Sequence, residues 1–312
     1  MSRPVRVSAL GPAPIPADPS CSLSGEVRRQ EARLSEWIYK VLPECPDLIV
    51  LHEACDRPSG LTREVQTEYY ALRGETILDR MREICRREGV NIAYSAALGQ
   101  PDGTYRNCTT FLGRNGETRG IYCKNHLVIE ERTEGNVLYG KDAPVIPMDF
   151  GTVAGVICFD LNFDELREKY VRSRPELLVF SSMYHGGFVQ QNWAYTCRSW
   201  FVGACAGLPC GVIDPTGKLV AESTNYYPYV THTINLDYAV AHLDHKWEAL
   251  DALRRTYKTG VRVSDPGLLG AVLLTSECEV PVSEMVREAG VELLDDYFAR
   301  SLADRHIPEH IG

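Results

Sequence analysis

The sequence predicts an α/β fold in which strands and helices alternate along most of the chain. The first observation is the stretch Gly151–Glu165, which opens with an apolar, β-branched run at Thr152–Ile157 that is typical of a buried strand. The second is the helical pattern of Asp164–Tyr170, followed by another apolar run at Leu177–Ser182, which completes a β-α-β unit. The third is the recurrence of strand and helix patterns on both sides of this unit, with several hairpin-type turns. This interleaving predicts a mixed sheet.

Cys158 lies at the end of the first strand of the central unit. The carboxyl edge of an open α/β sheet is where such folds bind their ligands. A helix N-terminus close by favours the thiolate over the thiol. Cys158 is therefore a candidate nucleophile, although a buried cysteine can also serve as a small core hydrophobe.

Composition and charge are those of an ordinary globular protein of 312 residues, with 44% hydrophobic and 24% charged residues. The net charge of −9 argues against a nucleic-acid partner. The N-terminal residues lack the apolar core of a signal peptide, and no apolar run reaches membrane-spanning length. The eleven cysteines include no CxxC pair, and several lie in apolar runs, which fits a reducing compartment. We expect a cytoplasmic protein that does not bind membranes.

The chain before the central unit carries two amphipathic helix patterns, Ser24–Val41 and Gly74–Glu88, and Gly89 follows the second as a C-cap would. The linkers PDGTY and GRNGE are typical of hairpin turns. The strands predicted in this part are Val5–Leu10, Asp47–His52, Asn91–Ala97, Asn107–Gly113, Arg119–Cys123 and Val145–Phe150.

The chain after the central unit predicts a helix at Gly187–Phe201 and a strand at Gly203–Ile213, then the tight turn Asp214–Gly217. From Ala239 the pattern becomes helical. We expect residues 1–312 to form a single domain, with a core at about 5–236 and a helical C-terminal extension at about 239–312. The remaining predicted elements are the strands Leu219–Glu222 and Tyr229–Leu236 and the helices Pro281–Ala289 and Leu293–Ala303.

Three residues suited to catalysis stand directly after apolar strands: Glu53, Lys124 and Cys158. Burying an unpaired charge is costly, so a carboxylate and an ammonium at such positions call for an explanation. If the strands are parallel neighbours, the three side chains converge on one pocket. A carboxylate base, a thiol nucleophile and an ammonium facing an oxyanion form a workable acyl-transfer site. Structural roles are the alternative, with Glu53 capping a turn and Lys124 extending to water.

The motifs around these residues resemble those of the nitrilase superfamily, the carbon–nitrogen hydrolases, over roughly residues 5–236. The family has a glutamate after its second strand, as in DLIVLHEACDRPSG, and a lysine as in IYCKNHLVIEER. Its cysteine motif is similar to GVICFDLNFDE. The segments VFSSMYHGG, NWAYTCRSWFVGACAG and GVIDPTGKLVAE resemble its substrate-wall loop, the following helix and its closing hairpin.

The resemblance implies that Cys158 is the nucleophile, Glu53 the general base and Lys124 the oxyanion-stabilising lysine, with the backbone N–H of Phe159 as a second oxyanion donor. Glu131 is similar to the family's second glutamate, although the nearby Glu130 and Glu134 leave the register open.

The same resemblance gives His126 a positioning role, and it implies that Asp160 and Glu165 hold the turn and the helix start. It also makes the side chains after the second apolar run of the central unit candidates for the substrate-binding wall. These are Met183, Tyr184, His185 and Trp193.

Family resemblance further implies a four-layer αββα sandwich, a homodimer, and catalysis without a metal or organic cofactor. The expected reaction is cleavage of a non-peptide C–N bond of a small amide or N-carbamoyl compound through a thioester. Asn162 replaces an arginine that many amidase members carry, which makes an acidic ω-amide less expected. Nitrile hydrolysis, acyl transfer to an amine, a non-catalytic scaffold and a Cys–His hydrolase using His126 or His185 remain alternatives.

The segment HLDHKW in the C-terminal extension contains His242, Asp244 and His245, which are metal-ligand residue types. We interpret it as a polar, solvated helical surface and predict no metal site there.

Overall fold

The computed structural model describes residues 1–311, and its tertiary contacts divide the chain into two compact units. The larger unit is Val5–Thr233, and the smaller joins Met1–Pro4 to residues 234–311. Among residues 1–311, none of the helices combines the length and the apolar character that crossing a membrane requires.

The larger unit contains two six-stranded sheets. In the first sheet β1, β2 and β3 are parallel, and β3, β4 and β5 are antiparallel neighbours, so β5 again runs in the direction of β2. The strand order of this sheet is β12-β1-β2-β3-β4-β5. Its bounds are β1 Pro4–Leu10, β2 Leu48–Leu51, β3 Asn91–Gly99, β4 Tyr105–Leu112, β5 Thr118–Cys123 and β12 Tyr229–Asn235.

The second sheet has the order β11-β10-β9-β8-β7-β6. Its three central strands, β7, β8 and β9, are parallel, and the outer strands pair antiparallel. The central strands consist almost entirely of buried residues, as expected for strands covered on both faces. The bounds are β6 Ile146–Pro147, β7 Thr152–Ile157, β8 Leu177–Ser182, β9 Trp200–Cys205, β10 Gly211–Ile213 and β11 Leu219–Glu222.

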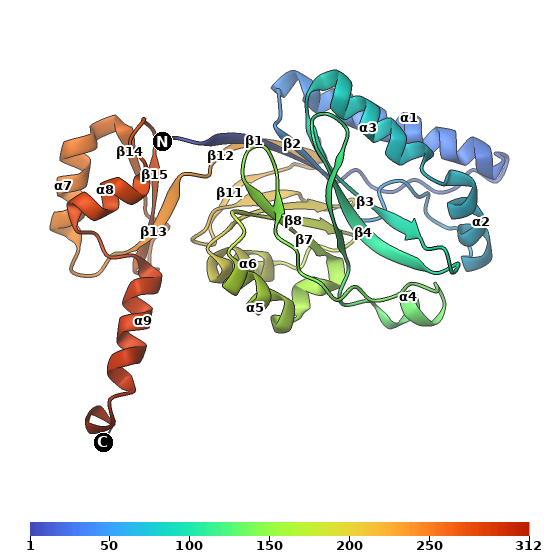
Figure 1. Cartoon of the computed structure of the whole chain (residues 1–312). Helices are drawn as coiled ribbons and strands as arrows, with labels where there is room; N and C mark the ends of the chain where they lie inside the picture. Colours follow the sequence, from blue (N-terminus) through green and yellow to red (C-terminus); the bar gives the residue numbers. More distant parts are fainter. Residues whose placement is uncertain (312) are drawn as a thin grey trace. The chain divides into compact units, whose positions relative to one another are not determined.

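The two sheets stack face to face between two layers of helices, which gives the predicted αββα sandwich (Figure 1). Strand β2 contacts β8 and β9, and the Ser181 hydroxyl on β8 donates to the Leu51 carbonyl on β2 at 2.8 Å. The helices of the first sheet lie on one side in the view and those of the second on the other. They are α1 Leu23–Val41, α2 Arg63–Arg73 and α3 Thr76–Glu88 for the first sheet, and α5 Asp164–Ser173 and α6 Phe188–Cys197 for the second.

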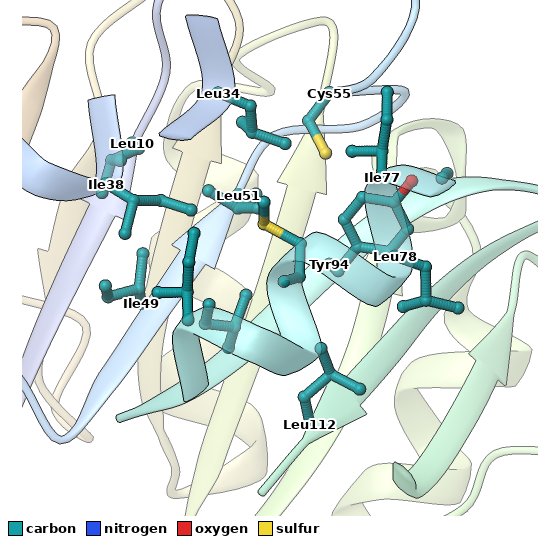
Figure 2. Close-up of a cluster of buried hydrophobic side chains, with 14 of the residues drawn as sticks. Leu10, Leu34, Ile38, Ile49, Leu51, Cys55, Ile77, Leu78, Tyr94 and Leu112 are labelled. Carbon is teal, nitrogen blue, oxygen red and sulfur yellow. The ribbon is translucent and has the colours of Figure 1, made fainter. Parts of the chain in front are cut away.

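A cluster of buried apolar side chains fixes helices α1 and α3 to the first sheet (Figure 2). On α1, Leu34 and Ile38 are one helical turn apart and both face the sheet, so the helix buries a continuous stripe. They pack with Ile49 and Leu51 of β2, whose four residues are all buried. This packing holds the end of β2, and therefore the residue that follows it, in a fixed position.

Several predicted elements differ in their bounds. Helix α6 ends at Cys197 and not at Phe201, because Arg198 adopts a left-handed backbone and Trp200 already begins β9. The strand predicted over Gly203–Ile213 is in fact two antiparallel strands, β9 and β10, separated by a turn. Helix α2 and the short helix α4 Ile129–Thr133 were not predicted.

The C-terminal extension contains the two predicted helices, α8 Val282–Ala289 and α9 Leu294–Arg305, but it is not purely helical. Its strands form an antiparallel sheet of order β13-β15-β14, and residues from this sheet and from α7 and α8 form a separate apolar core. The pattern was misread because short, fully buried strands such as β15 lack the alternation that marks a half-exposed strand. The bounds are β13 Tyr238–His242, β14 Val261–Ser264, β15 Ala271–Ser276 and α7 Trp247–Tyr257.

The HLDHKW segment is also not helical up to Lys246, and α7 begins only at its last residue, Trp247. His242 is the last residue of β13, is 7% exposed, and stacks on the Tyr297 ring with centroids 3.7 Å apart. Its imidazole is therefore part of the packing of this unit. Within residues 1–311, no group of three or more His, Cys, Asp or Glu side chains is arranged to hold a metal ion.

Candidate active site

Glu53, Lys124 and Cys158 line one cavity of about 220 Å³ in the larger unit. Glu53 follows β2 and Lys124 follows β5 in the first sheet, and Cys158 follows β7 in the second. The three strands are therefore not neighbours in one sheet, as the simplest interpretation of the sequence required. The residues meet because the two sheets stack with these strand ends at the same edge.

Lys124 is the centre of the charged part of the site. Its side chain is 1% exposed, and Nζ lies 2.8 Å from Glu53 Oε1 and 2.8 Å from Glu131 Oε2. The Asn107 amide donates to the same two carboxylates, at 2.8 and 3.1 Å. Burial alone would lower the pKa of Lys124, but the two carboxylates outweigh it and raise the pKa above its usual value. Lys124 is thus held as an ammonium ion.

Glu53 is 4% exposed and is held as a carboxylate. Burial by itself would raise its pKa, but the Lys124 charge and hydrogen bonds from Lys124, Cys158 and Asn107 lower the pKa below its usual value. The backbone N–H of Met183 donates to the second carboxylate oxygen at 3.1 Å. Glu53 therefore has an anionic oxygen directed at a thiol, which is the arrangement that a general base needs.

Cys158 occupies a sharp turn between β7 and the short 3-10 helix Cys158–Asn162, with φ of 48°. This left-handed conformation is costly for a residue with a side chain and is common at functional sites. The thiol is partly exposed, and Cys158 lines the cavity together with Glu53. Burial and the Glu53 charge raise the pKa of Cys158 to about 12. The thiolate favoured by the helix N-terminus is therefore not the resting form, and the thiol needs a base.

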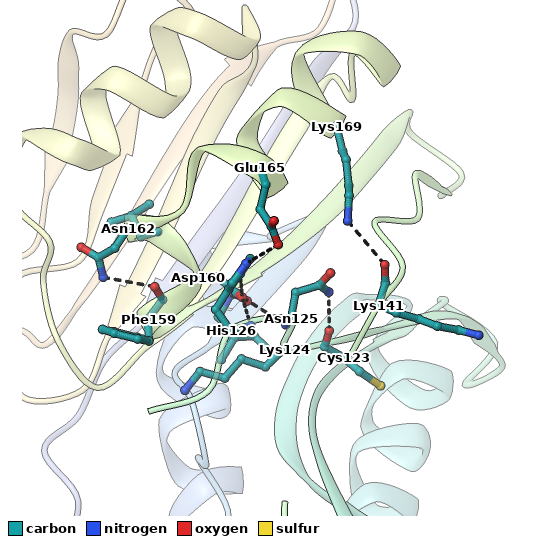
Figure 3. A network of polar contacts seen from close by, with 12 residues as sticks. Cys123, Lys124, Asn125, His126, Lys141, Phe159, Asp160, Asn162, Glu165 and Lys169 are labelled. Carbon is teal, nitrogen blue, oxygen red and sulfur yellow. Dashed lines mark hydrogen bonds and ion pairs between the residues drawn. The ribbon is translucent and has the colours of Figure 1, made fainter. Parts of the chain in front are cut away.

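Asp160 connects the turn that carries Cys158 to the segment that carries Lys124 (Figure 3). Its buried Oδ1 accepts from the backbone N–H groups of Asn125 and His126, at 3.1 and 2.7 Å. Its Oδ2 accepts from the Tyr122 hydroxyl at 2.6 Å and from the Ile157 N–H at 3.1 Å. One carboxylate thus accepts hydrogen bonds both from the segment around Lys124 and from the residue before Cys158. This fits the positioning role expected for Asp160.

His126 lies between two carboxylates and does not line the cavity. Nδ1 is 3.0 Å from Asp160 Oδ1, and Nε2 is 2.8 Å from Glu165 Oε1 (Figure 3). The ring also stacks on Phe163, with centroids 4.0 Å apart. Both ring nitrogens are thus occupied, which favours the positioning role over that of a base for Cys158.

A pH-dependent contribution to stability follows from this contact. Burial lowers the pKa of His126, but hydrogen bonds to Asp160 and Glu165 outweigh it, so the folded-state pKa is raised. The contribution is therefore fully present below the unfolded pKa of about 6.5 and is lost as the pH rises through the folded pKa. The free energy of unfolding should therefore decrease as the pH rises above 6, and we expect this decrease to be smaller in His126→Asn. Urea titration at a series of pH values above 6 measures it. The exposed His306→Asn variant is the control and should keep the wild-type slope.

Glu131 is the glutamate of this segment that lies next to Lys124. Glu131, and neither of its acidic neighbours, contacts the Lys124 ammonium, and its Oε2 also accepts from the Val128 N–H at 3.0 Å at the start of α4. Met183 lines the cavity beside Cys158. The Phe159 ring packs edge-on against Phe163 outside the cavity wall, so only its backbone N–H remains a candidate contact.

The other residues proposed for the substrate wall lie outside it. Trp193 is 1% exposed and donates from its indole to a backbone carbonyl at 2.9 Å, which is a packing role. The Tyr184 hydroxyl accepts from the Asn162 amide at 3.1 Å, and His185 Nδ1 accepts from a backbone N–H at 3.1 Å. These contacts fix the loop after β8, and substrate contact remains a prediction for Met183.

Sequence reasoning missed Asn107 and the wall contributed by α2 and the loop before it. Asn107 is a polar residue inside an otherwise ordinary strand, and only its distance to two carboxylates shows its role. The α2 side of the cavity could not be predicted because the helix itself was not. The additional lining residues are Ala54, Arg57, Arg63, Gln66, Tyr70, Ala97, Val128 and Val137.

Comparison with known proteins shows which family the chain resembles in sequence. A family model described as carbon–nitrogen hydrolase matches residues 33–241. A probable nitrilase from Schizosaccharomyces pombe is 22% identical over 240 residues, which cover 68% of this chain and 85% of that protein.

Among solved structures, Nit3 of Saccharomyces cerevisiae, a member of branch 10 of the nitrilase superfamily, matches with a TM-score of 0.63 at 15% identity. The match covers 82% of this chain and 95% of Nit3. A variant of the amidase from Nesterenkonia sp. AN1, with the acetamide moiety of fluoroacetamide added covalently at its active-site cysteine, matches with a TM-score of 0.62 at 15% identity. This match covers 75% of this chain and 90% of that one.

Proposed function

Because this chain belongs to the carbon–nitrogen hydrolase family, we propose that it hydrolyses a non-peptide C–N bond of a small amide or N-carbamoyl compound through a thioester on Cys158. The observation that carries the proposal is the Glu53–Lys124–Glu131 cluster, in which Glu53 and Lys124 are buried and which faces a neutral thiol at the wall of a cavity of about 220 Å³. A cavity of this size suits a small molecule and not a folded polypeptide.

In the first half of the proposed reaction, Glu53 takes the proton of Cys158 as the sulfur attacks the carbonyl carbon. The developing oxyanion is stabilised by the Lys124 ammonium and the Phe159 N–H. Glu53 then gives its proton to the leaving nitrogen, and ammonia or an amine departs as the thioester forms. A base is required because the pKa of the resting thiol, about 12, leaves little thiolate at neutral pH.

In the second half, Glu53 is again a carboxylate and takes a proton from an attacking water. The tetrahedral intermediate collapses, and the proton returns to Cys158 as the product leaves, which is a carboxylic acid from an amide and a carbamic acid, which then loses carbon dioxide, from an N-carbamoyl compound. Glu131 contacts Lys124 and not the thiol, so its proposed role is to hold the ammonium in place and to keep it charged.

Ammonia release from a panel of small amides, N-carbamoyl compounds and nitriles tests the proposal. We expect at least one amide or carbamoyl compound to be hydrolysed by the wild type. Cys158→Ala should lose this activity while keeping the wild-type circular dichroism spectrum and thermal midpoint. Undiminished ammonia release by Cys158→Ala would exclude the thioester mechanism.

The nitrile arm of the panel tests the second candidate function. A nitrile would be attacked by the same Cys158, and the similarity to a probable nitrilase supports including it. Ammonia release from nitriles but from no amide would replace the amidase proposal. A homodimer and a cytoplasmic location complete the proposal, and light scattering on the purified protein tests the first of these.

A further inference from the structure

Two arginine side chains lie at the wall of the active-site cavity, on the side facing α2. Arg57 and Arg63 line this cavity and also a second one of about 350 Å³, which shares Gln66 with it. The two residues therefore border both the active-site cavity and an outer hollow. This position suits contact with the end of a substrate that points away from Cys158.

These two cations are not neutralised in the way that Lys124 is. Lys124 lies 2.8 Å from each of two carboxylates. Arg63 reaches only Glu134, at 3.9 Å, and its Nη1 donates to the Gln66 side chain at 3.3 Å. Arg57 donates to the Tyr70 hydroxyl at 3.4 Å, and among residues 1–311 it forms no ion pair with a carboxylate. The cavity wall thus has an excess of positive charge at this end.

We infer that Arg57 and Arg63 form a carboxylate-binding subsite, so that the preferred substrate is a small amide with a carboxylate at its far end. The inference rests on the proposed function and specifies its substrate class. A planar guanidinium matches a carboxylate through paired hydrogen bonds. The inference also revises the expectation, drawn from Asn162, that an acidic amide is a less expected substrate. The positive charge comes from the α2 side of the cavity and not from the segment after the nucleophile.

The test compares succinamate and glutaramate with succinamide and glutaramide, which have the same shape but no carboxylate. A hydrogen bond to a charged group strengthens binding by a factor of roughly 10 to 100. We therefore expect kcat/KM for the half-amides to exceed that for the diamides by about this factor. Arg57→Gln and Arg63→Gln should raise KM for the half-amides about 10-fold or more, with little change in kcat. KM for the diamides should change much less than KM for the half-amides.

Arg132→Gln is the matched control, because Arg132 is exposed on α4 and does not line the cavity. It should keep the half-amide preference. Equal kcat/KM for half-amides and diamides, or an equal effect of Arg57→Gln on both, would overturn the inference while leaving the proposed function intact. Hydrolysis of none of the amides, N-carbamoyl compounds or nitriles tested would instead count against the proposed function itself.

A second, independent feature is a pair of cysteines behind the site. Cys108 on β4 and Cys123 on β5 are direct cross-strand partners in the antiparallel pair. Cys108 is buried, but Cys123 also lines a separate cavity of about 350 Å³ together with Arg106. The pair therefore has an accessible member and a resolving member, which a reversible disulfide requires.

The pair is directly coupled to catalytic groups through the chain. Asn107 precedes Cys108, and Lys124 follows Cys123, and the Lys124 N–H donates to the Asn107 carbonyl at 2.8 Å. Because side chains alternate along strands, the thiols lie on the face opposite Asn107 and Lys124. A disulfide requires the two sulfurs to lie about 2.05 Å apart. We expect the movement that brings them together to displace the adjacent residues.

We propose that Cys108 and Cys123 form a reversible disulfide that lowers the activity of the site. With hydrogen peroxide, the Cys123 sulfur attacks one oxygen and becomes a sulfenic acid as water leaves. The Cys108 sulfur then attacks that sulfur, and a second water leaves, so two thiols are oxidised and one peroxide is reduced. The hydrogen bond with Cys108 and the nearby Arg106 lower the pKa of Cys123, which favours it as the attacking thiol.

Peptide mapping without reductant, after peroxide treatment of Cys158→Ala, tests whether the bond forms. We expect a linked Cys108–Cys123 peptide that dithiothreitol separates, and in Cys108→Ser a dimedone adduct on Cys123 instead. Full alkylation of both cysteines after a treatment that oxidises the exposed Cys45 would overturn the proposal.

The functional part is tested by comparing the wild type with Cys108→Ser/Cys123→Ser. Both proteins contain Cys158, so oxidation of the nucleophile affects both equally. After peroxide treatment we expect the activity of the wild type to fall by a factor about 10-fold larger than that of the double variant, because small displacements of catalytic groups have large effects on rate. Dithiothreitol should restore this activity. Equal loss in the two proteins would contradict a role of the disulfide in activity.

Discussion

Glu53→Gln is expected to reduce kcat for the best amide substrate by about 10²–10⁴-fold, the usual range for loss of a general base. Gln has no basic oxygen, so neither the Cys158 proton nor a proton of the attacking water can be taken. The fold should persist, because Lys124 keeps its 2.8 Å contact with Glu131. Steady-state ammonia release measures the loss.

A second measurement separates the loss of the base from general damage. The Glu53 charge is among the causes that raise the pKa of Cys158, so Glu53→Gln should shift alkylation of Cys158 by iodoacetamide to lower pH. Turnover and thiol reactivity would then change in opposite directions. A variant that keeps most of its turnover would contradict the role of Glu53 and would favour a Cys–His mechanism. Glu130→Gln, on the exposed side of α4, is the matched control.

Lys124→Met is expected to have the largest combined effect on activity and stability. It removes the cation that we propose stabilises the oxyanion, and loss of such a group typically costs 10²–10³-fold in kcat. It also leaves two carboxylates close together in a buried site, and breaking a buried ion pair typically destabilises by about 3–5 kcal/mol. Urea unfolding and ammonia release measure the two effects. Lys40→Met removes a surface ion pair with Glu36, and its free energy of unfolding should change by less than about 1 kcal/mol.

The pH dependence gives a further check on Lys124→Met. In the wild type the pKa of Glu53 is lowered, so its contribution to stability is present above the unfolded pKa of about 4.3 and is lost as the pH falls through the folded value. Without Lys124, burial dominates and the pKa of Glu53 should rise above its usual value. The variant should then become less stable as the pH rises towards neutral. A stability profile parallel to that of the wild type would contradict this account of the cluster.

The sequence was sufficient for the strands that carry the site but not for their arrangement. The apolar runs at β2 and β7 are unambiguous because their residues are buried on both faces, and family resemblance selected the residues at their ends. Helix α2 was missed because only Tyr69, Tyr70 and Arg73 on it are buried, so it has no regular apolar stripe.

Features that depend on contacts between residues far apart in the chain could not be predicted from the sequence. Asn107 acts through its distance to two glutamates, and Arg57 through its position on a cavity that other segments complete. The ionisation of Cys158 was misjudged for the same reason. A helix N-terminus can be read from the chain, but the burial of the thiol and the Glu53 charge beside it, which outweigh the helix, cannot.

The most direct test of the central claim is the mass of the protein after a single turnover. Enzyme in excess is mixed with a hydrolysed amide, quenched with acid at a series of times, and mapped by peptide mass spectrometry beside Cys158→Ala. The account predicts a transient increase equal to the acyl group on the Cys158 peptide, absent from the variant and appearing together with the released ammonia. Release of ammonia with no mass change on Cys158 at any time would contradict it.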